Sequence, residues 1–299
     1  MGVRKLHRNE PDFDEDLVRA LVDGQFPRWA DLPLKYVDSN GTQNVLYRLG
    51  EEWVVRLPRL PGVVQELADA REWMPYLAAR LPVPVPEQVA EGEPGHGFPW
   101  PWAVHRWLPG ENPVVGRLDR PEAEALAEDL AGFVTAMRAI DTAGAPESFR
   151  GRPLAERADG TREVIRRLDG TLDSAAALAV WGEAVRTPGA DRDVWLHADL
   201  QPGNLLVSRG RLGAVIDFGC MGTGDPAVDL ITAWYVLGGP ERRVFREAVA
   251  VDDGVWARAR GWALTIAVHE LAYYRDSNPF MVRSASRVVG EILAEAARA

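Results

Sequence analysis

The chain has 299 residues, of which 46% are hydrophobic and 26% are charged, a composition that excludes an intrinsically disordered protein and suits one large domain or two lobes. It carries 44 Asp and Glu against 34 Lys and Arg, and the net charge of -10 disfavours general binding to nucleic acid or to anionic membranes. No apolar run approaches the roughly 20 residues that span a bilayer, and a single cysteine, Cys220, excludes an intramolecular disulfide, so we expect a cytoplasmic protein.

Two helices and three strands are predicted in the first third of the chain. Apolar residues recur at helical spacing in residues 12–24, and a second helix should begin near Pro61. Strands are predicted at 35–37, 44–49 and 53–57. The last two flank a short polar turn and should pair as a hairpin.

Proline residues restrict the chain after this hairpin. Pro75 should kink the second helix or end it early, because proline lacks an amide hydrogen and clashes with the preceding turn. Residues 103–108 are predicted as a further strand that ends at Pro109-Gly110. We place a boundary there, with residues 1–108 as a nucleotide-binding lobe and 109–299 as a catalytic and substrate-binding lobe.

The second lobe is predicted to be mainly helical. Its clearest helical period runs from Leu126 to Ile140. Further helices are predicted at 161–169, 172–186, 226–237, 241–250, 253–275 and 280–298. Short strands are predicted at 194–196, 205–207 and 212–216. A small β-rich lobe followed by a larger helical lobe is an α+β, bilobal arrangement.

Two motifs in residues 197–219 have the residue types and spacing of a catalytic site. Asp199 and Asn204 lie five residues apart in a segment that Pro202-Gly203 keeps from being helical, and Asp217-Phe218-Gly219 follows an apolar strand. This order and spacing match the catalytic loop and the metal loop of kinases. The alternative is a pair of polar turns that flank a hairpin.

The residue types suit phosphoryl transfer, which needs positioning, charge neutralisation and a group that orients the attacking hydroxyl. Mg²⁺ prefers oxygen ligands, so Asn204 and Asp217 are the predicted metal ligands. Asp199 is the predicted catalytic residue, which accepts the proton of the acceptor hydroxyl or orients that hydroxyl. His197 is predicted to brace the loop through hydrogen bonds.

With these motifs the chain resembles the aminoglycoside phosphotransferase family, which is related to choline kinases. The resemblance lies in W-L-H-A-D-L-Q-P-G-N-L-L-V, V-I-D-F-G and G-D-P-A-V-D-L, and it extends to N-V-L-Y-R-L-G-E-E-W-V-V-R-L-P-R at 44–59 and V-H-R-W-L-P-G at 104–110. It implies a protein-kinase-like fold that binds ATP or GTP between two lobes, with two Mg²⁺ ions. A protein kinase is disfavoured, because Asp225-Pro226 follows Gly219 closely and no Ala-Pro-Glu motif occurs there.

The resemblance also implies the residues that contact the phosphates. Arg56 stands at the strand position of the family's phosphate-contacting lysine. The usual acidic partner would fall at Ala70, and we choose Glu66 instead, because Glu66 lies nearer the apolar face of its helix than Glu72 does. The alternative is that Glu66 is solvated and Arg56 pairs elsewhere.

The rest of the nucleotide site is predicted on two segments. The turn at 39–44 should cover the phosphates through Ser39 and Thr42, with an ordinary hairpin turn as the alternative. By resemblance, the C=O of Arg106 and the N–H of Leu108 should contact the base.

The acceptor pocket is expected in the helical lobe. Aminoglycosides are polycations, so a pocket for them needs carboxylates, and Glu270 and Asp276 are the candidates. Trp234 and Tyr235 are candidates for an aromatic wall, with helix packing as the alternative reading.

Two further carboxylates are predicted to be structural. Asp225 and Asp229 should brace the catalytic loop or cap the helix that begins near Pro226.

We therefore predict an O-phosphotransferase that moves the γ-phosphate of ATP or GTP to a hydroxyl of an aminoglycoside-like antibiotic. A macrolide, a sugar, a choline-like alcohol or a nucleoside is the alternative acceptor. A nucleotide-binding pseudokinase is a further alternative, motivated by Arg56 and Ala70, although the presence of Asp199, Asn204 and Asp217 favours an enzyme. The expected partners are the nucleoside triphosphate and the small acceptor, without nucleic acid or membrane.

Overall fold

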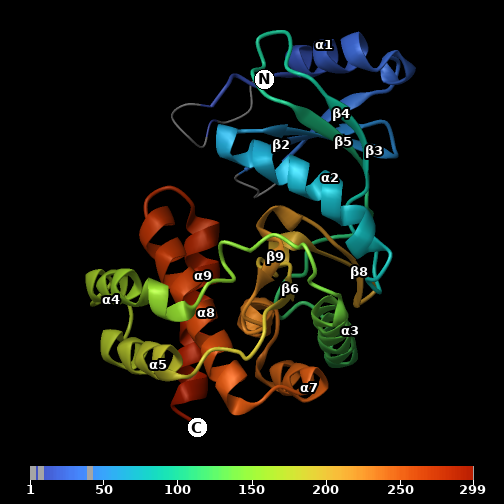
Figure 1. Ribbon diagram of the computed structural model, residues 1–299. Coiled ribbons are helices and arrows are strands. Elements are labelled where there is room, and N and C mark those ends of the chain that lie inside the picture. The colour runs from blue at the N-terminus through green and yellow to red at the C-terminus, as the bar shows by residue number, and fades with distance from the viewer. Residues whose placement is uncertain (1–4, 6–9, 39–42, 299) are drawn as a thin grey trace. The chain divides into compact units, whose positions relative to one another are not determined.

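The computed structural model describes residues 5, 10–38 and 43–298, so Ser39 and Thr42 lie outside the described residues. The chain packs into two units, whose elements Figure 1 labels. The first unit comprises Met1–Ala79, Pro84–Gly110 and Ala214–Gly219, and the second comprises Arg80–Val83, Glu111–Gly213 and Cys220–Ala299.

An antiparallel sheet of five strands forms the centre of the first unit, in the order β1-β2-β3-β5-β4. The strands are β1 Leu34–Val37, β2 Asn44–Leu49, β3 Trp53–Pro58, β4 Gln88–Gly92 and β5 Trp102–Arg106. β4 was not predicted, because its sequence contains one β-branched residue and ends in glycine. That glycine lets the ring of Trp102 approach the backbone.

The two faces of this sheet carry different side chains, because successive residues of a strand alternate between faces. Val55 and Leu57 of β3 belong to the apolar core that includes helix α1 (Glu15–Gln25). Arg56 of β3 and His105 of β5 instead line a small cavity with helix α2 (Val64–Ala78). The sheet therefore places Arg56 and His105 on the side of α2.

Helix α2 differs from the prediction in one respect. It continues to Ala78 with Pro75 inside it, so of the two outcomes predicted for Pro75 the early end does not occur, and the kink stays a prediction. Pro75 lies in the last turn, where only one backbone hydrogen bond is lost.

The second unit is built around one buried helix. Its helices are α3 Arg120–Ala139, α4 Ala158–Arg167, α5 Ser174–Arg186, α6 Thr232–Tyr235, α7 Gly239–Val249, α8 Asp253–Tyr274 and α9 Pro279–Ala296. α8 is buried on all sides from Trp256 to Thr265, which is typical of a central helix, and α9 lies beside it (Figure 1). The predicted helix at 226–237 is a short 3₁₀ segment, Val228–Ile231, followed by the single turn of α6.

Two short strand pairs lie beside the predicted catalytic motifs. β6 (Val194–Leu196) pairs with β9 (Gly222–Gly224), which was not predicted. β7 (Leu205–Ser208) pairs with β8 (Arg211–Val215), and Arg209 and Gly210 between them both have positive φ, as a two-residue hairpin requires.

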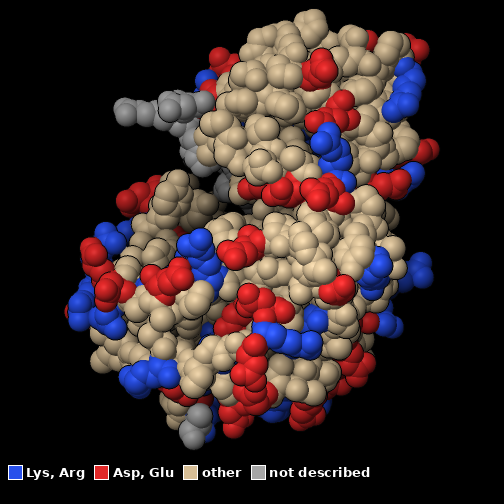
Figure 2. Space-filling view, in the orientation of Figure 1, with Lys and Arg blue, Asp and Glu red and all other residues tan. Residues whose placement is uncertain are grey.

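The surface of each unit mixes both signs of charge. Figure 2 shows Lys and Arg interspersed with Asp and Glu on the visible face. No helix in the described part of the chain has the length and apolar character to cross a membrane.

Candidate active site

The predicted catalytic loop begins directly after β6. Ala198 has a φ of 64° there, which is a strained conformation for a residue with a side chain. The buried carboxylate of Asp229 accepts hydrogen bonds from the backbone N–H of His197 at 2.9 Å and of Ala198 at 2.7 Å. Burial raises the pKa of Asp229, and these two hydrogen bonds oppose that rise. Asp229 therefore holds the strained turn in position.

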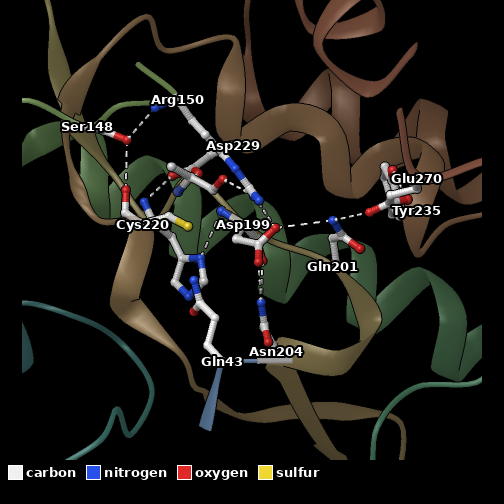
Figure 3. Close-up of polar contacts among 12 residues, drawn as sticks. Gln43, Ser148, Arg150, Asp199, Gln201, Asn204, Cys220, Asp229, Tyr235 and Glu270 are labelled. Carbon is white, nitrogen blue, oxygen red and sulfur yellow. Dashed lines mark hydrogen bonds and ion pairs between the residues drawn. The ribbon is translucent and has the colours of Figure 1, made fainter. Parts of the chain in front are cut away.

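The carboxylate of Asp199 is held from several directions (Figure 3). Asn204 donates from Nδ2 to Oδ2 of Asp199 at 3.0 Å and to its backbone carbonyl at 2.8 Å. The backbone N–H of Asp199 donates to Nδ1 of His197 at 3.2 Å. These two hydrogen bonds fix the orientation of the Asn204 amide. No donor among the described residues contacts its Oδ1, so this oxygen is available to a cation.

Arg150 approaches the other oxygen of the same carboxylate, and no sequence motif predicted this residue. Its Nη1 forms an ion pair with Oδ1 of Asp199 and donates to the carbonyl oxygen of Ala198 at 3.0 Å. The backbone N–H of Arg150 donates to Oγ of Ser148, which in turn donates to the carbonyl oxygen of Cys220 at 2.7 Å. Arg150 lies 49 residues before Asp199, so only the tertiary fold brings them together.

Glycine residues allow the segment that carries Arg150 to lie directly on β9. A Cβ on Gly151 would lie 2.5 Å from the carbonyl oxygen of Thr223, and a Cβ on Gly222 would lie 2.5 Å from the backbone nitrogen of Ser148. The N–H of Ser148 donates to that carbonyl of Thr223 at 3.0 Å. No side chain fits between the two segments, so their contact is made by backbone.

A second polar chain leads from Asp199 to α8. Nε2 of Gln201 donates to Oδ1 of Asp199 at 3.2 Å and to Oε1 of Glu270 at 3.0 Å, and the hydroxyl of Tyr235 donates to Oε2 of Glu270 at 2.8 Å (Figure 3). Burial raises the pKa of Glu270 to about 7. Burial and the carboxylate of Glu270 also raise the pKa of Tyr235. No role was predicted for Gln201, which links the two carboxylates.

The other acceptor candidates lie in different surroundings. Trp234 is fully buried and donates from Nε1 to Oε2 of Glu295 at 2.7 Å. This position agrees with helix packing, the alternative to a role in an aromatic wall. Asp276 is exposed in the turn that follows α8. These positions give no structural support to a substrate role for either residue, and for both that role stays a prediction.

Asp225 belongs to a buried ion pair. Its two oxygens accept hydrogen bonds from Nε and Nη2 of Arg258 on α8, at 2.7 and 3.1 Å. Oδ1 also accepts from the backbone N–H of Ala227 at 2.9 Å. A bidentate arginine is a rigid partner, so Asp225 ties the chain after β9 to the central helix.

In the first unit, Arg56 reaches the Asp-Phe-Gly motif. Nη2 of Arg56 lies 3.3 Å from Oδ1 of Asp217, and Asp217 has a φ of 63°. Glu66 accepts a hydrogen bond from Nε2 of Gln43 at 3.3 Å, and its carboxylate packs against Gly219 so closely that a Cβ there would clash. The pairing of Arg56 with Glu66 stays a prediction.

A cavity of about 20 Å³, enough for one water molecule, lies between β3, β5 and α2 and is lined by Arg56, Glu66, Asn44 and His105. Burial, and then the charge of Arg56, lower the pKa of His105 to about 3. Among the described residues neither ring nitrogen of His105 has a hydrogen-bond partner, and Oδ1 of Asn44 has none either. His105 was not predicted, since a histidine within an apolar strand has no distinguishing sequence signal.

The end of β5 and the segment that follows it contain the predicted base contacts, Arg106 and Leu108. The side chain of Arg106 donates to Glu87 at 2.8 Å. Within the described chain the N–H of Leu108 has no hydrogen-bond partner. That amide is therefore available to a ligand.

The residues proposed for Mg²⁺ offer oxygen ligands. Asn204 presents Oδ1, and Asp217 presents a carboxylate of which Arg56 contacts one oxygen. No group of three His, Cys, Asp or Glu residues suited to a metal occurs in the part of the chain that the structure describes. An amide oxygen and a carboxylate are each suitable ligand types for Mg²⁺, which is commonly bound by few protein ligands together with water and phosphate oxygens.

A family model described as the phosphotransferase enzyme family matches residues 37–262. The chain belongs to this family. The match includes both predicted motifs and most of both units, and it confirms the resemblance seen in the sequence. No curated protein sequence matches the chain.

Solved structures share the fold of this phosphotransferase. An aminoglycoside phosphotransferase in complex with GDP and kanamycin is 22% identical with a TM-score of 0.72, and the match covers 93% of this chain and 98% of that one. The GDP complex of an aminoglycoside 2'-phosphotransferase is 19% identical with a TM-score of 0.75, over 95% and 100% of the two chains. A macrolide 2'-phosphotransferase from Brachybacterium faecium is 22% identical with a TM-score of 0.63, over 92% and 98%. The predicted α+β kinase-like fold is thereby confirmed.

Proposed function

We propose that this phosphotransferase moves the γ-phosphate of ATP or GTP to a hydroxyl of a small antibiotic-like acceptor, in a reaction that depends on Mg²⁺. The observation that supports it most is the arrangement at Asp199. Asn204 fixes one oxygen of the carboxylate and leaves its own Oδ1 available to a cation. Proteins of this fold are named as aminoglycoside and macrolide phosphotransferases, and these two antibiotic classes are the first acceptors to test.

Asp199 is the catalytic residue of the proposed mechanism. Its carboxylate orients the acceptor hydroxyl and accepts the proton as the oxygen bonds to the γ-phosphorus, while the nucleoside diphosphate leaves with the electron pair of the broken bond. Asn204 and Asp217 would hold Mg²⁺, and the bound ion supplies charge neutralisation on the phosphates. Arg56 would contact phosphate oxygens, and the N–H of Leu108 the base.

We also propose that the enzyme works in the cytoplasm and that it confers antibiotic resistance. A nucleoside triphosphate co-substrate and the single cysteine support the location. The names of the solved relatives support the resistance role.

The test is phosphate transfer from γ-labelled ATP and GTP to a panel of aminoglycosides, macrolides, sugars and amino alcohols. We expect at least one labelled acceptor, and Asp199→Asn should lower kcat by about 10²–10⁴-fold while nucleotide binding is retained. Asp193→Asn, at an exposed position before β6, is the matched control. Nucleotide binding without transfer to any acceptor would identify a pseudokinase instead, and an unchanged transfer rate in Asp199→Asn would refute the catalytic role of Asp199.

A further inference from the structure

Arg150 places a fixed positive charge at the catalytic carboxylate. Its side chain is 23% exposed, and its Nη1 is bonded both to Asp199 and to the carbonyl oxygen of Ala198. A guanidinium remains charged at any physiological pH. The charge of Asp199 is therefore compensated before any acceptor arrives.

The backbone around Arg150 shows that this contact is built into the fold. The segment is bonded to β9 through Ser148 and packs against it without intervening side chains at Gly151. The N–H of Arg150 itself donates to Oγ of Ser148 at 3.2 Å. A long side chain on a mobile surface loop would visit Asp199 only part of the time, whereas this one starts from a backbone fixed at several points.

The next carboxylate along this cluster contributes less than a full negative charge near neutral pH. Glu270 is bonded to Tyr235 and Gln201, and burial raises its pKa to about 7. The group formed by Arg150, Asp199 and Glu270 therefore carries a net charge between zero and one negative unit near neutral pH. An aminoglycoside has several ammonium groups, so its binding needs more negative charge than this group of three residues provides. The guanidinium of Arg150 would also repel an ammonium group of the aminoglycoside.

We propose that Arg150 determines acceptor specificity: it selects hydroxyl compounds with at most one positive charge and disfavours polycations. Nε and Nη2 of Arg150 have no hydrogen-bond partner among the described residues, so they can donate to an uncharged oxygen of the acceptor beside the reacting hydroxyl. This inference rests on the proposed phosphotransferase function and narrows its acceptor class.

The experiment measures the binding of kanamycin, a polycation, and of erythromycin, a macrolide with one amine, by calorimetry. Arg150→Gln removes the charge, and Arg150→Lys keeps it. We expect Arg150→Gln to bind kanamycin at least about 10-fold more tightly than the parent does, and its affinity for erythromycin to change less than about 3-fold. Arg150→Lys should resemble the parent. Circular dichroism checks the fold, and Arg150→Leu replaces the glutamine variant if that variant does not fold.

Two results would overturn the proposal. The first is kanamycin affinity that is the same in the parent and in Arg150→Gln, including undetectable binding to both. The second is an equal gain in Arg150→Lys, which would show that charge is not the cause. Transfer assays separate this inference from the function: preferred phosphorylation of kanamycin by the parent would refute the specificity while the function stands. The expected affinity shifts without transfer to any acceptor would refute the function while the specificity stands.

Discussion

At the scale of single residues, Glu270 has a raised pKa near the predicted catalytic loop. It lies on the central helix α8, where Tyr235 and Gln201 donate to its two oxygens. Burial outweighs these hydrogen bonds and raises its pKa from 4.5 to about 7. In the unfolded chain the same carboxyl has its ordinary pKa. At pH values between 4.5 and about 7 it is therefore mostly ionised in the unfolded state and mostly protonated in the folded state.

This shift gives a prediction for Glu270→Gln. As pH rises from 4.5 to 7 the parent loses about 3 kcal/mol of unfolding free energy through Glu270, because one pKa unit corresponds to about 1.4 kcal/mol. Glutamine does not titrate, so the stability of the variant relative to the parent should increase by that amount over this range. Urea unfolding at several pH values measures it, with Glu247→Gln at an exposed position of α7 as the control. A difference independent of pH would contradict the raised pKa.

The site residues that were predicted and those that were missed differ in how far along the sequence they lie from their hydrogen-bond partners. Asp199 and Asn204 are five residues apart, so their hydrogen bonds follow from a local motif. Arg150, which was missed, reaches the same site across 49 residues. No local spacing encodes such a contact, and a single sequence therefore predicts the loop but not the arginine that pairs with it.

At the scale of elements, the contact between β9 and the segment Pro146–Gly151 supports the catalytic loop. β9 pairs with β6, the strand that leads into the loop, and the segment beside β9 carries Arg150. A strand of three residues, two of them glycine, has almost no sequence signal of its own. It forms because both of its edges are paired by backbone, which also explains why it was not predicted.

Gly151→Ala should disturb this contact. The new Cβ would lie 2.5 Å from the carbonyl oxygen of Thr223, closer than side-chain carbons approach, so the segment must move. We expect a loss of about 1–3 kcal/mol in unfolding free energy and a lower kcat with any acceptor, because Arg150 moves with the segment. Gly160→Ala in α4 is the matched control, since its Cβ meets nothing within 4 Å, and it should be neutral or stabilising. Equal behaviour of the two variants would refute the role of the contact.

At the scale of the whole molecule, the fold class was predictable because the order of elements changes once along the chain. Strand patterns dominate up to Arg106, and helical periods dominate after Arg120. The boundary at 108 stays a prediction, and the second segment of the first unit, Pro84–Gly110, ends two residues after it. The return of Ala214–Gly219 to that unit was not predictable, because it depends on tertiary packing alone.

Nucleotide binding should stabilise the whole protein by mass action. At a free concentration 100 times its Kd, a ligand that binds only the folded state adds about 2.7 kcal/mol, which raises the Tm by several degrees. We expect ATP or GTP with Mg²⁺ to give this shift and EDTA to reduce it. Asp217→Asn should lose the part that depends on Mg²⁺, whereas Asp191→Asn on an exposed loop should keep it. Equal shifts with Mg²⁺ and with EDTA would argue against a magnesium site.

Asp229 makes the conformation of the predicted catalytic loop depend directly on folding. The amide hydrogens of His197 and Ala198 are both held by this one buried carboxylate. They can exchange with deuterium from the solvent only when the surrounding core opens. The orientation of Asp199 is thus set when the helical unit folds. Deuterium exchange at these two amides measures the free energy of opening, and the same opening would release the predicted catalytic loop from its strained conformation.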